Sequence, residues 1–150
     1  MAARNAELSR RIFEDVWNHK NLSAVDDLMS ADYVHHDPSS PAVPSGVDGY
    51  KQFVNSYMNA FPDAHFTIDD AFTDGQNTEV HNEVTRWTFT GTHEGELAGI
   101  PRSGRRFSVT GISIARIVNG KITESWNNWD ALGLMQQLGV VPSEAKGRAA

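Results

Sequence analysis

The sequence contains no cysteine and no long run of apolar residues. Without cysteine the chain can form neither a disulfide framework nor a thiolate nucleophile, which is compatible with a reducing compartment. No stretch approaches the roughly 20 apolar residues of a membrane-spanning helix, and the N-terminal segment lacks the apolar core of a signal peptide. We therefore expect a soluble, cytoplasmic protein with no attachment to a membrane.

Positive charge is also scarce, with 13 Lys and Arg residues against 19 Asp and Glu residues. The formal net charge of −6 disfavours a nucleic-acid partner, because the phosphate backbone repels an acidic protein. Arg102, Arg105 and Arg106 form a small cluster, which we interpret as the exposed tip of a hairpin. The sequence also lacks a Gly-rich phosphate loop, a dinucleotide fingerprint and a Ser-His-Asp order. Any reaction must therefore depend on acid–base and electrostatic groups.

Hydrophobic periodicity predicts helices in the first part of the chain and strands in the second. Helical spacing of apolar residues covers about residues 4–18, part of 24–30, and 47–61. Strand patterns cover about 64–73, 77–90, 105–118 and 121–130, and a short helix follows over 132–138. This order indicates an α+β fold with helices on one face of a curved sheet, a cone whose open end can hold a small apolar ligand. We expect one domain over residues 1–142 and a mobile tail over 143–150.

The end of the last predicted strand carries the first candidate for chemistry. Because alternate residues of a strand share a face, Trp126, Asn128 and Asp130 are expected on one side, with Ile122 further along it. A carboxylate beside an aromatic wall is desolvated, which suits it to proton transfer. The alternative for Asp130 is a structural role, since aspartate is a favoured N-cap and a helix follows directly. The capping signature is incomplete, because Gly133 stands where a capping box has Glu or Gln.

A second cluster is the run His35-His36-Asp37-Pro38. Adjacent histidines of a strand point to opposite faces, and no cysteine or His-x-x-x-His helix accompanies them, so we do not expect a metal site. A histidine at a strand end beside a Pro-rich loop is better interpreted as a hydrogen-bonding or proton-shuttling group. The alternative is a surface histidine held by Asp37.

Arg86 lies within a predicted strand, flanked by Val84 and Trp87. A guanidinium among apolar neighbours needs an anionic or carbonyl partner. Glu83 or Asp130 could provide one, unless Arg86 emerges at the surface.

Several motifs in the second half of the chain form a pattern that we recognise. They are GTHEG from Gly91 to Gly95, GIPRSGR from Gly99 to Arg105, the segment from Arg116 to Asp130, and LGLMQQLG from Leu132 to Gly139. Together with YVHHDP and AFPD upstream, they resemble the SnoaL-like polyketide cyclases, or ester cyclases, of the nuclear transport factor 2-like superfamily. The resemblance covers about residues 5 to 142. The sequence departs from the pattern at Arg102, where proline is common, and at Ser103, where threonine is common.

The resemblance implies a cone-shaped α+β barrel that assembles into homodimers or homotetramers through the outer face of its sheet. It further implies a small aromatic substrate, a methyl ester of an anthraquinone-type polyketide, and no cofactor or metal. In the family an aspartate that matches Asp130 is the general acid and base for an intramolecular aldol closure. The histidine that matches His36 lies near it.

We therefore predict a cofactor-free cyclase in which Asp130 is the acid–base group and His36 assists. The further residues that we expect to contact the substrate are His35, Phe53, Tyr57, Arg86, Trp87, Phe89, Trp126 and Asn128. Asn128, His36 or Arg86 could stabilise the oxygen that gains charge. Two alternatives are a cofactor-independent hydroxylase of a similar polyketide and a non-catalytic small-molecule binding module.

Overall fold

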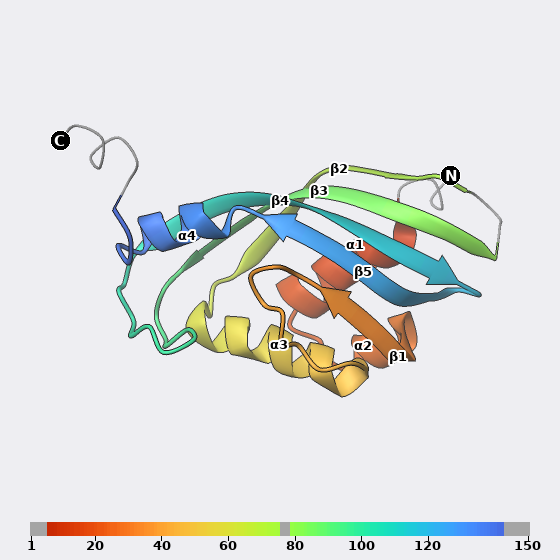
Figure 1. Cartoon of the computed structure of the whole chain (residues 1–150), viewed down its shortest axis with the longest axis horizontal. Coiled ribbons are helices and arrows are strands. Elements are labelled where there is room, and N and C mark those ends of the chain that lie inside the picture. Colours follow the sequence, from red (N-terminus) through yellow and green to blue (C-terminus); the bar gives the residue numbers. More distant parts are fainter. Residues whose placement is uncertain (1–5, 76–78, 143–150) are drawn as a thin grey trace.

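The computed structural model describes residues 6–75 and 79–142, and Figure 1 shows the arrangement of its elements. The helical elements are α1 (Glu7–Arg11), the π-helical segment η2 (Ile12–Asn18), α2 (Ala24–Leu28), α3 (Val47–Ala60) and α4 (Ala131–Gln137). The strands are β1 (Met29–His36), β2 (His65–Thr73), β3 (Val80–Thr92), β4 (Arg106–Val118) and β5 (Lys121–Trp129). The predicted succession of helices and long strands is confirmed, with β1 placed between α2 and α3.

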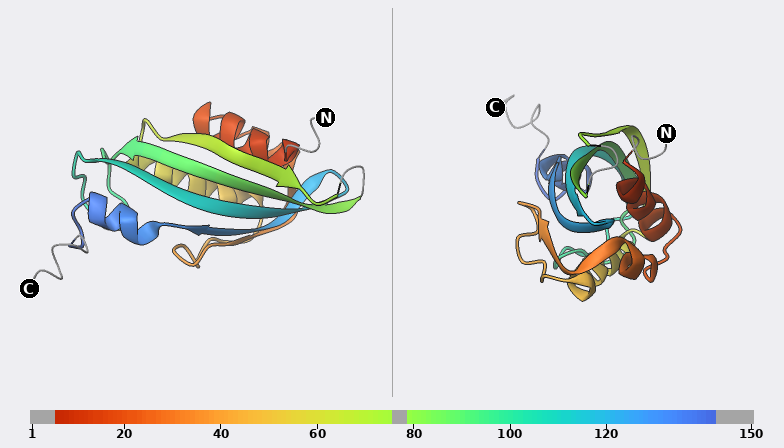
Figure 2. Two further views of the ribbon diagram at one scale, coloured as in Figure 1. Left: turned by 90° about the horizontal axis from the view of Figure 1, so that it is seen from above. Right: turned by 90° about the vertical axis from the view of Figure 1, so that its right-hand side faces the viewer.

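The strands form one sheet of five strands in the order β1-β5-β4-β3-β2. β1 runs parallel to β5, whereas the other neighbouring strands are antiparallel. Seen end-on in Figure 2, the strands trace a curve that the helices close. The expected α+β fold, with helices packed on a strongly curved and mainly antiparallel sheet, is confirmed.

Aromatic rings fill the concave side of the sheet. β4 alternates between exposed and buried residues, because one face of the sheet meets the core and the other meets solvent. Phe66 of β2 stacks on Phe89 of β3 with ring centroids 4.3 Å apart, and Trp17 of η2 meets Phe66 edge-on at 5.1 Å. Such pairs stabilise the fold beyond the apolar area that they bury.

The first helix widens into the π-helical segment η2 where it crosses this aromatic layer. A π-helix bonds each residue to the fifth one along, and such segments often occur near functional sites. Ile12, Phe13, Val16 and Trp17 are the buried residues of η2. The wide turn therefore presents several large side chains to the sheet together.

A β-bulge in β5 decides which side chains of that strand face the core. Arg116 pairs with Glu124 and Ile117 pairs with Ile122, so Thr123 is an extra residue without a partner on β4. An extra residue reverses the alternation of a strand. Ile122 and Ser125, three positions apart, are consequently both buried.

β1 carries a second irregularity. Its register with β5 shifts between Met29 and Val34 and then continues through His35↔Ser125 and His36↔Trp126. β1 lies at the edge of the sheet, where such shifts are common. The shift sets which of the two adjacent histidines points into the cone.

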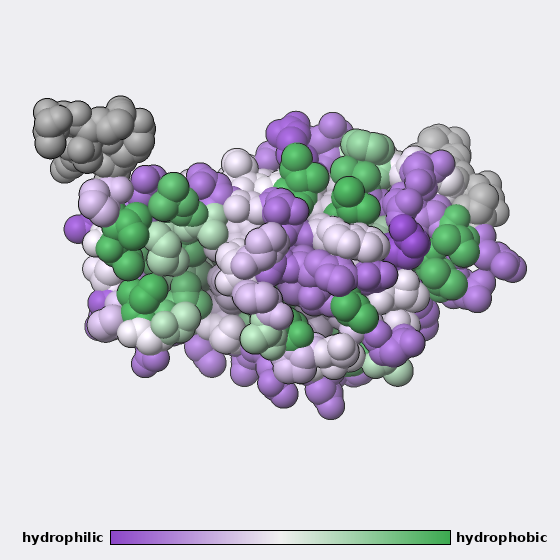
Figure 3. All heavy atoms as spheres, in the orientation of Figure 1, coloured by the Kyte–Doolittle hydropathy of each residue, from purple (hydrophilic) through white to green (hydrophobic). Residues whose placement is uncertain are grey.

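The outer surface mixes polar and apolar side chains, as Figure 3 shows for one side of the molecule. Leu132 of α4 and Val140 beyond it are 62% and 46% exposed. Every helix within the described ranges falls short of the length and apolar character of a membrane span. The predicted tail, residues 143–150, lies outside the described residues, and the division of the chain at residue 142 stays a prediction.

Candidate active site

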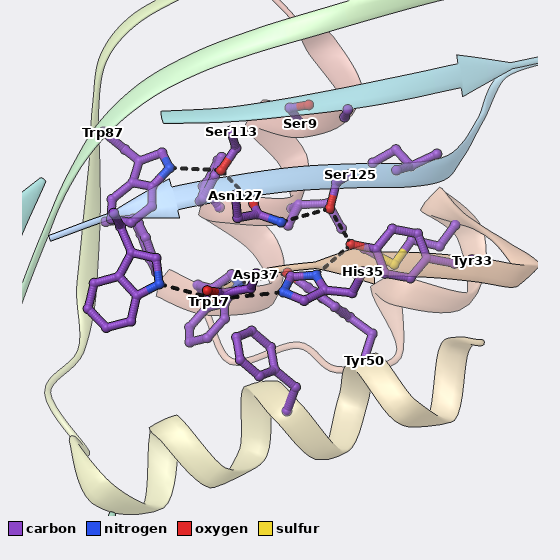
Figure 4. A pocket seen from close by; sticks show the side chains of 18 of the residues that line it. Ser9, Trp17, Tyr33, His35, Asp37, Tyr50, Trp87, Ser113, Ser125 and Asn127 are labelled. Atoms are coloured by element: carbon purple, nitrogen blue, oxygen red, sulfur yellow. Dashed lines mark hydrogen bonds and ion pairs between the residues drawn. The ribbon is translucent and has the colours of Figure 1, made fainter. Parts of the chain in front are cut away.

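A cavity lies between the concave face of the sheet and the helices η2 and α3 (Figure 4). Its empty space is about 730 Å³ when the open mouth is included. The aromatic residues that line it are Phe13, Trp17, Tyr33, Tyr50, Phe53, Tyr57, Phe66, Trp87, Phe89 and Trp129. Concave apolar pockets with a few polar groups are typical small-molecule sites. The wall of flat rings suits an aromatic ligand.

Asp37, directly after β1, places a carboxylate in this cavity. It is 5% exposed, and both of its oxygens accept hydrogen bonds. Oδ1 accepts from the Ser39 backbone N–H at 2.9 Å and from the Ser39 hydroxyl at 2.7 Å, while Oδ2 accepts from Trp129 Nε1 at 3.1 Å. These bonds fix the orientation of the carboxylate toward the aromatic wall, and a buried charge of this kind needs such partners.

His35, the last inward-facing residue of β1, lies beside Asp37. Its Nε2 is buried without a hydrogen-bond partner and is 4.0 Å from Asp37 Oδ2. That separation is too long for a hydrogen bond. Burial lowers the pKa of His35 to about 4, although the negative charge of Asp37 acts in the opposite direction. The imidazole is therefore neutral near pH 7, with one ring nitrogen free to contact a ligand.

A chain of hydrogen bonds runs along the inner face of the sheet toward His35 (Figure 4). Trp87 Nε1 donates to Ser113 Oγ at 3.0 Å, and Ser113 Oγ donates to Asn127 Oδ1 at 2.6 Å. Asn127 Nδ2 in turn donates to Ser125 Oγ at 3.0 Å and to the His36 backbone carbonyl at 3.1 Å. The polar groups of β4 and β5 that face the cavity thus bond to one another.

Tyr33 links this chain to the imidazole. Its hydroxyl is 2.5 Å from Ser125 Oγ and 2.8 Å from His35 Nδ1. Burial raises the pKa of Tyr33 well above its ordinary value, so the phenol keeps its proton. His35 is therefore held on one side by Tyr33, while its other nitrogen faces Asp37.

Asp130 lies outside the cavity, so the prediction that its face of β5 lines the pocket is wrong. It is exposed, and its Oδ1 accepts a hydrogen bond from the Gly133 backbone N–H at 2.9 Å at the start of α4. A Cβ at Gly133 would come within 2.2 Å of Asp130 Oδ2. Gly133, which makes the capping signature incomplete, thus leaves room for the Asp130 side chain at the start of α4. Asp130 therefore occupies the position of an N-cap, as in the structural alternative.

Trp126 and Asn128 do share one face, as predicted, but that face is the outer one, where His36 also lies. His36 Nε2 is 2.6 Å from Glu124 Oε2, and its ring stacks on Trp126 with an interplanar angle of 15°. Asn128 is exposed. The cause is the bulge at Thr123, which turns Ile122 inward and the following even-numbered residues outward.

Arg86 is exposed on the outer face of β3, where it pairs in register with the exposed Ile112. The prediction that places Arg86 in the pocket is therefore wrong, and the alternative that Arg86 emerges at the surface is correct. The other predicted residues, His35, Phe53, Tyr57, Trp87 and Phe89, line the cavity. Their contact with a substrate stays a prediction.

Several polar residues that line this cavity are not among the functional residues predicted from the sequence. They are Tyr33, Asp37, Ser113, Ser125 and Asn127. For Tyr33 and Asp37 a signal was present in the alternation of β1 and the residue after it, because both have the same parity as His35. Within the part of the chain that the structure describes, no group of three or more His, Cys, Asp or Glu residues is placed to hold a metal ion.

Comparison with known proteins gives consistent matches. The model of the family described as SnoaL-like polyketide cyclase matches residues 7–138. Aklanonic acid methyl ester cyclase DnrD from Streptomyces peucetius is 49% identical over 49 residues, which are 33% of this chain and 34% of that protein. The chain thus matches about a third of the length of this curated relative.

Among the solved structures that are similar over nearly the whole chain, two carry different assignments. A proposed polyketide cyclase from Acidithiobacillus ferrooxidans is 31% identical, with a TM-score of 0.76 and coverage of 89% of this chain and 92% of the other. AclR, a proposed hydroxylase from Streptomyces galilaeus, is 26% identical, with a TM-score of 0.75 and coverage of 95% and 86%. The same fold therefore occurs in a proposed cyclase and in a proposed hydroxylase.

Proposed function

Because the chain belongs to the SnoaL-like polyketide cyclase family, we propose that it closes a ring in an aromatic polyketide methyl ester by an intramolecular aldol reaction. Asp37 is the general base in this proposal, and His35 stabilises the oxygen that gains charge. The observation that carries it is the buried Asp37 carboxylate 4.0 Å from the unpartnered Nε2 of His35, inside an aromatic cavity. Asp130 and His36 have no part in the chemistry.

The reaction needs a base and a hydrogen-bond donor in a dry pocket. A C–H flanked by two carbonyls is acidic enough for a carboxylate to remove its proton, and Asp37 takes that proton. The enolate oxygen receives a hydrogen bond from His35, whose neutral imidazole acts as the donor. The enolate carbon then forms a bond to a ketone carbon of the same molecule, and the proton on Asp37 passes to the new alkoxide. The product is an isomer of the substrate.

The charge of the cavity supports an ester as the substrate. Among the described residues that line it, Asp37 is a carboxylate and none is lysine or arginine. A substrate with a free carboxylate would meet a like charge without a compensating cation. An uncharged methyl ester avoids that repulsion, and its planar rings can lie against Trp87 and Trp129.

The test is an assay of the purified protein with aklanonic acid methyl ester and with simpler anthraquinone methyl esters, with separation of isomers by chromatography and mass spectrometry. Asp37→Asn is expected to lower kcat by about 10²–10⁴-fold, the usual contribution of a general base. Asp130→Asn, a matched carboxylate outside the cavity, is expected to keep the rate. Full activity of Asp37→Asn, or loss of activity only in Asp130→Asn, would overturn the assignment.

A second candidate is hydroxylation of a similar polyketide, which the likeness to AclR favours. In that reaction the deprotonated substrate would reduce dioxygen and bond to it as a hydroperoxide, and a thiol reductant from solution would convert the hydroperoxide into the hydroxylated product and water. Oxygen consumption that depends on the substrate, with a product heavier by one oxygen atom, would select this candidate. Tight ligand uptake without any product would indicate a binding module.

A further inference from the structure

We infer that Asn127, acting through Ser125 and Tyr33, fixes the tautomer of His35 so that its proton sits on Nε2, inside the cavity. These three are positioning residues, and their importance for catalysis rests on the function proposed above. The inference follows from counting which groups in the chain can donate and which can accept.

The amide of Asn127 has one possible orientation. Its Nδ2 lies 3.1 Å from the backbone carbonyl of His36, which can only accept a hydrogen bond. Its Oδ1 lies 2.6 Å from Ser113 Oγ, whose hydroxyl receives the indole N–H of Trp87, a group that can only donate. A flipped amide would place its carbonyl against the His36 carbonyl. The His36 carbonyl, which can only accept, thus sets the orientation of the amide, and the Ser113 hydroxyl is compatible with it.

The orientation of Asn127 determines the direction of the remaining bonds. Ser125 Oγ receives an N–H from Asn127 and cannot donate back to an amide nitrogen. Within the described part of the chain the other polar partner of Ser125 Oγ is the Tyr33 hydroxyl, 2.5 Å away, so the Ser125 proton has an acceptor there and we assign it to that bond. The phenol proton of Tyr33 then goes to His35 Nδ1 at 2.8 Å, which makes Nδ1 the acceptor. A neutral imidazole with Nδ1 unprotonated carries its hydrogen on Nε2.

This tautomer decides what His35 can do in the cavity. The Nε2–H is unpartnered and lies beside the carboxylate of Asp37. It can donate a hydrogen bond to an oxygen that gains negative charge. In the other tautomer a lone pair on Nε2 would face both Asp37 and that oxygen, and the imidazole would be a second base without a donor.

The test is nitrogen NMR of ligand-free protein labelled with ¹⁵N-histidine, in which protonated and unprotonated ring nitrogens resonate apart. The His35 signal is assigned by its loss in His35→Gln. We expect a single Nε2–H tautomer near pH 7 in the wild-type protein. In Asn127→Leu the Ser125 oxygen no longer receives the competing N–H of Asn127, so it accepts more readily from Tyr33 and both tautomers should appear. The control Asn128→Leu changes the neighbouring exposed residue and should keep the wild-type spectrum.

Ser125→Ala is a smaller change that also removes the donor to Tyr33, and it should give mixed tautomers as well. An Nδ1–H tautomer in the wild-type protein overturns the inference. A wild-type spectrum in both folded variants also overturns it, because Asp37 alone would then set the tautomer. Thermal unfolding of each variant shows that it is folded.

A kinetic measurement connects the tautomer to the reaction. If the protein is a cyclase, kcat of Asn127→Leu and Ser125→Ala should fall in proportion to the remaining fraction of the Nε2–H form. A loss of kcat in a variant that keeps the wild-type spectrum contradicts the positioning role. If no cyclase activity is found but the spectra change as expected, the proposed function fails while the tautomer assignment stands.

Discussion

The inner and outer faces of the sheet carry nearly the same kinds of residues and use them differently. The inner residues are His35, Asp37, Asn127 and Trp129, and their outer counterparts are His36, Asp130, Asn128 and Trp126. On the inner face Trp129 donates to the buried carboxylate of Asp37, and Asn127 is linked to His35 through Ser125 and Tyr33. On the outer face Asp130 holds the first turn of α4, and His36 lies against Trp126 in contact with solvent. Residue type therefore does not locate this site, whereas strand register does.

The two carboxylates make the contrast concrete. Asp37 is 5% exposed and receives an indole N–H, a backbone N–H and a hydroxyl. Asp130 is exposed and receives the backbone N–H of a helix start. The first arrangement orients a buried carboxylate toward an aromatic cavity, and the second satisfies a donor that a helix leaves unpaired.

The largest difference between the faces is expected from tryptophan removal. Trp87 is 5% exposed and starts the hydrogen-bond chain, so Trp87→Ala should lower the free energy of unfolding by about 3–5 kcal/mol. Trp126 contacts His36 and Arg116 on the outer face, and Trp126→Ala should cost about 1 kcal/mol or less. Urea denaturation of both variants gives the two values. Equal losses would contradict the distinction between the faces.

A second effect of the buried inner face is expected when the pH is lowered. An ordinary histidine of the unfolded chain takes up a proton near pH 6.5, whereas buried His35 does so only near pH 4. Between these values the unfolded chain binds more protons than the folded protein, so the free energy of unfolding falls as the pH falls. The His35 contribution to this loss should be about 3 kcal/mol between pH 7 and pH 4.

Denaturation curves at several pH values measure this loss, and His35→Gln supplies the comparison. The variant should lose less stability than the wild-type protein over the same range, because the substituted side chain does not titrate. Parallel curves for the two proteins would show that His35 takes up its proton equally easily in the folded and unfolded states.

The smallest effect is expected at the outer carboxylate. Asp130→Ala removes the acceptor for the Gly133 N–H, and loss of an N-cap costs about 1 kcal/mol. Chemical denaturation should detect this loss, while ligand binding in the cavity should not change. A large defect in binding with unchanged stability would return Asp130 to the site.

Much of the fold follows from local patterns in the sequence. The helical stripe of α3 and the alternation of β3 and β4 extend over many residues, so their periods are unambiguous. The same alternation brought Trp87 and Phe89 to the cavity. Predictions that depended on a regular period over long elements were therefore correct.

The failures in β5 have one physical source. Ile122 and Trp126 are both apolar and share parity, so an unbroken strand would bury both. The unpaired Thr123 between them is not a glycine and has no distinctive side chain, and only its pairing with β4 reveals the bulge. One extra residue thus exchanged the faces of β5 and moved Asn128 and Asp130 out of the expected site.

The irregular register of β1 has a consequence for how such a site can be gained or lost during evolution. β1 is an edge strand whose pairing with β5 shifts between Met29 and Val34. A single residue inserted or deleted in that segment would exchange the faces of everything after it. His36 would then enter the cone, while His35 and Asp37 would leave it. Two relatives can therefore keep His-His-Asp-Pro unchanged and still differ in activity, through nothing more than the length of the segment before it.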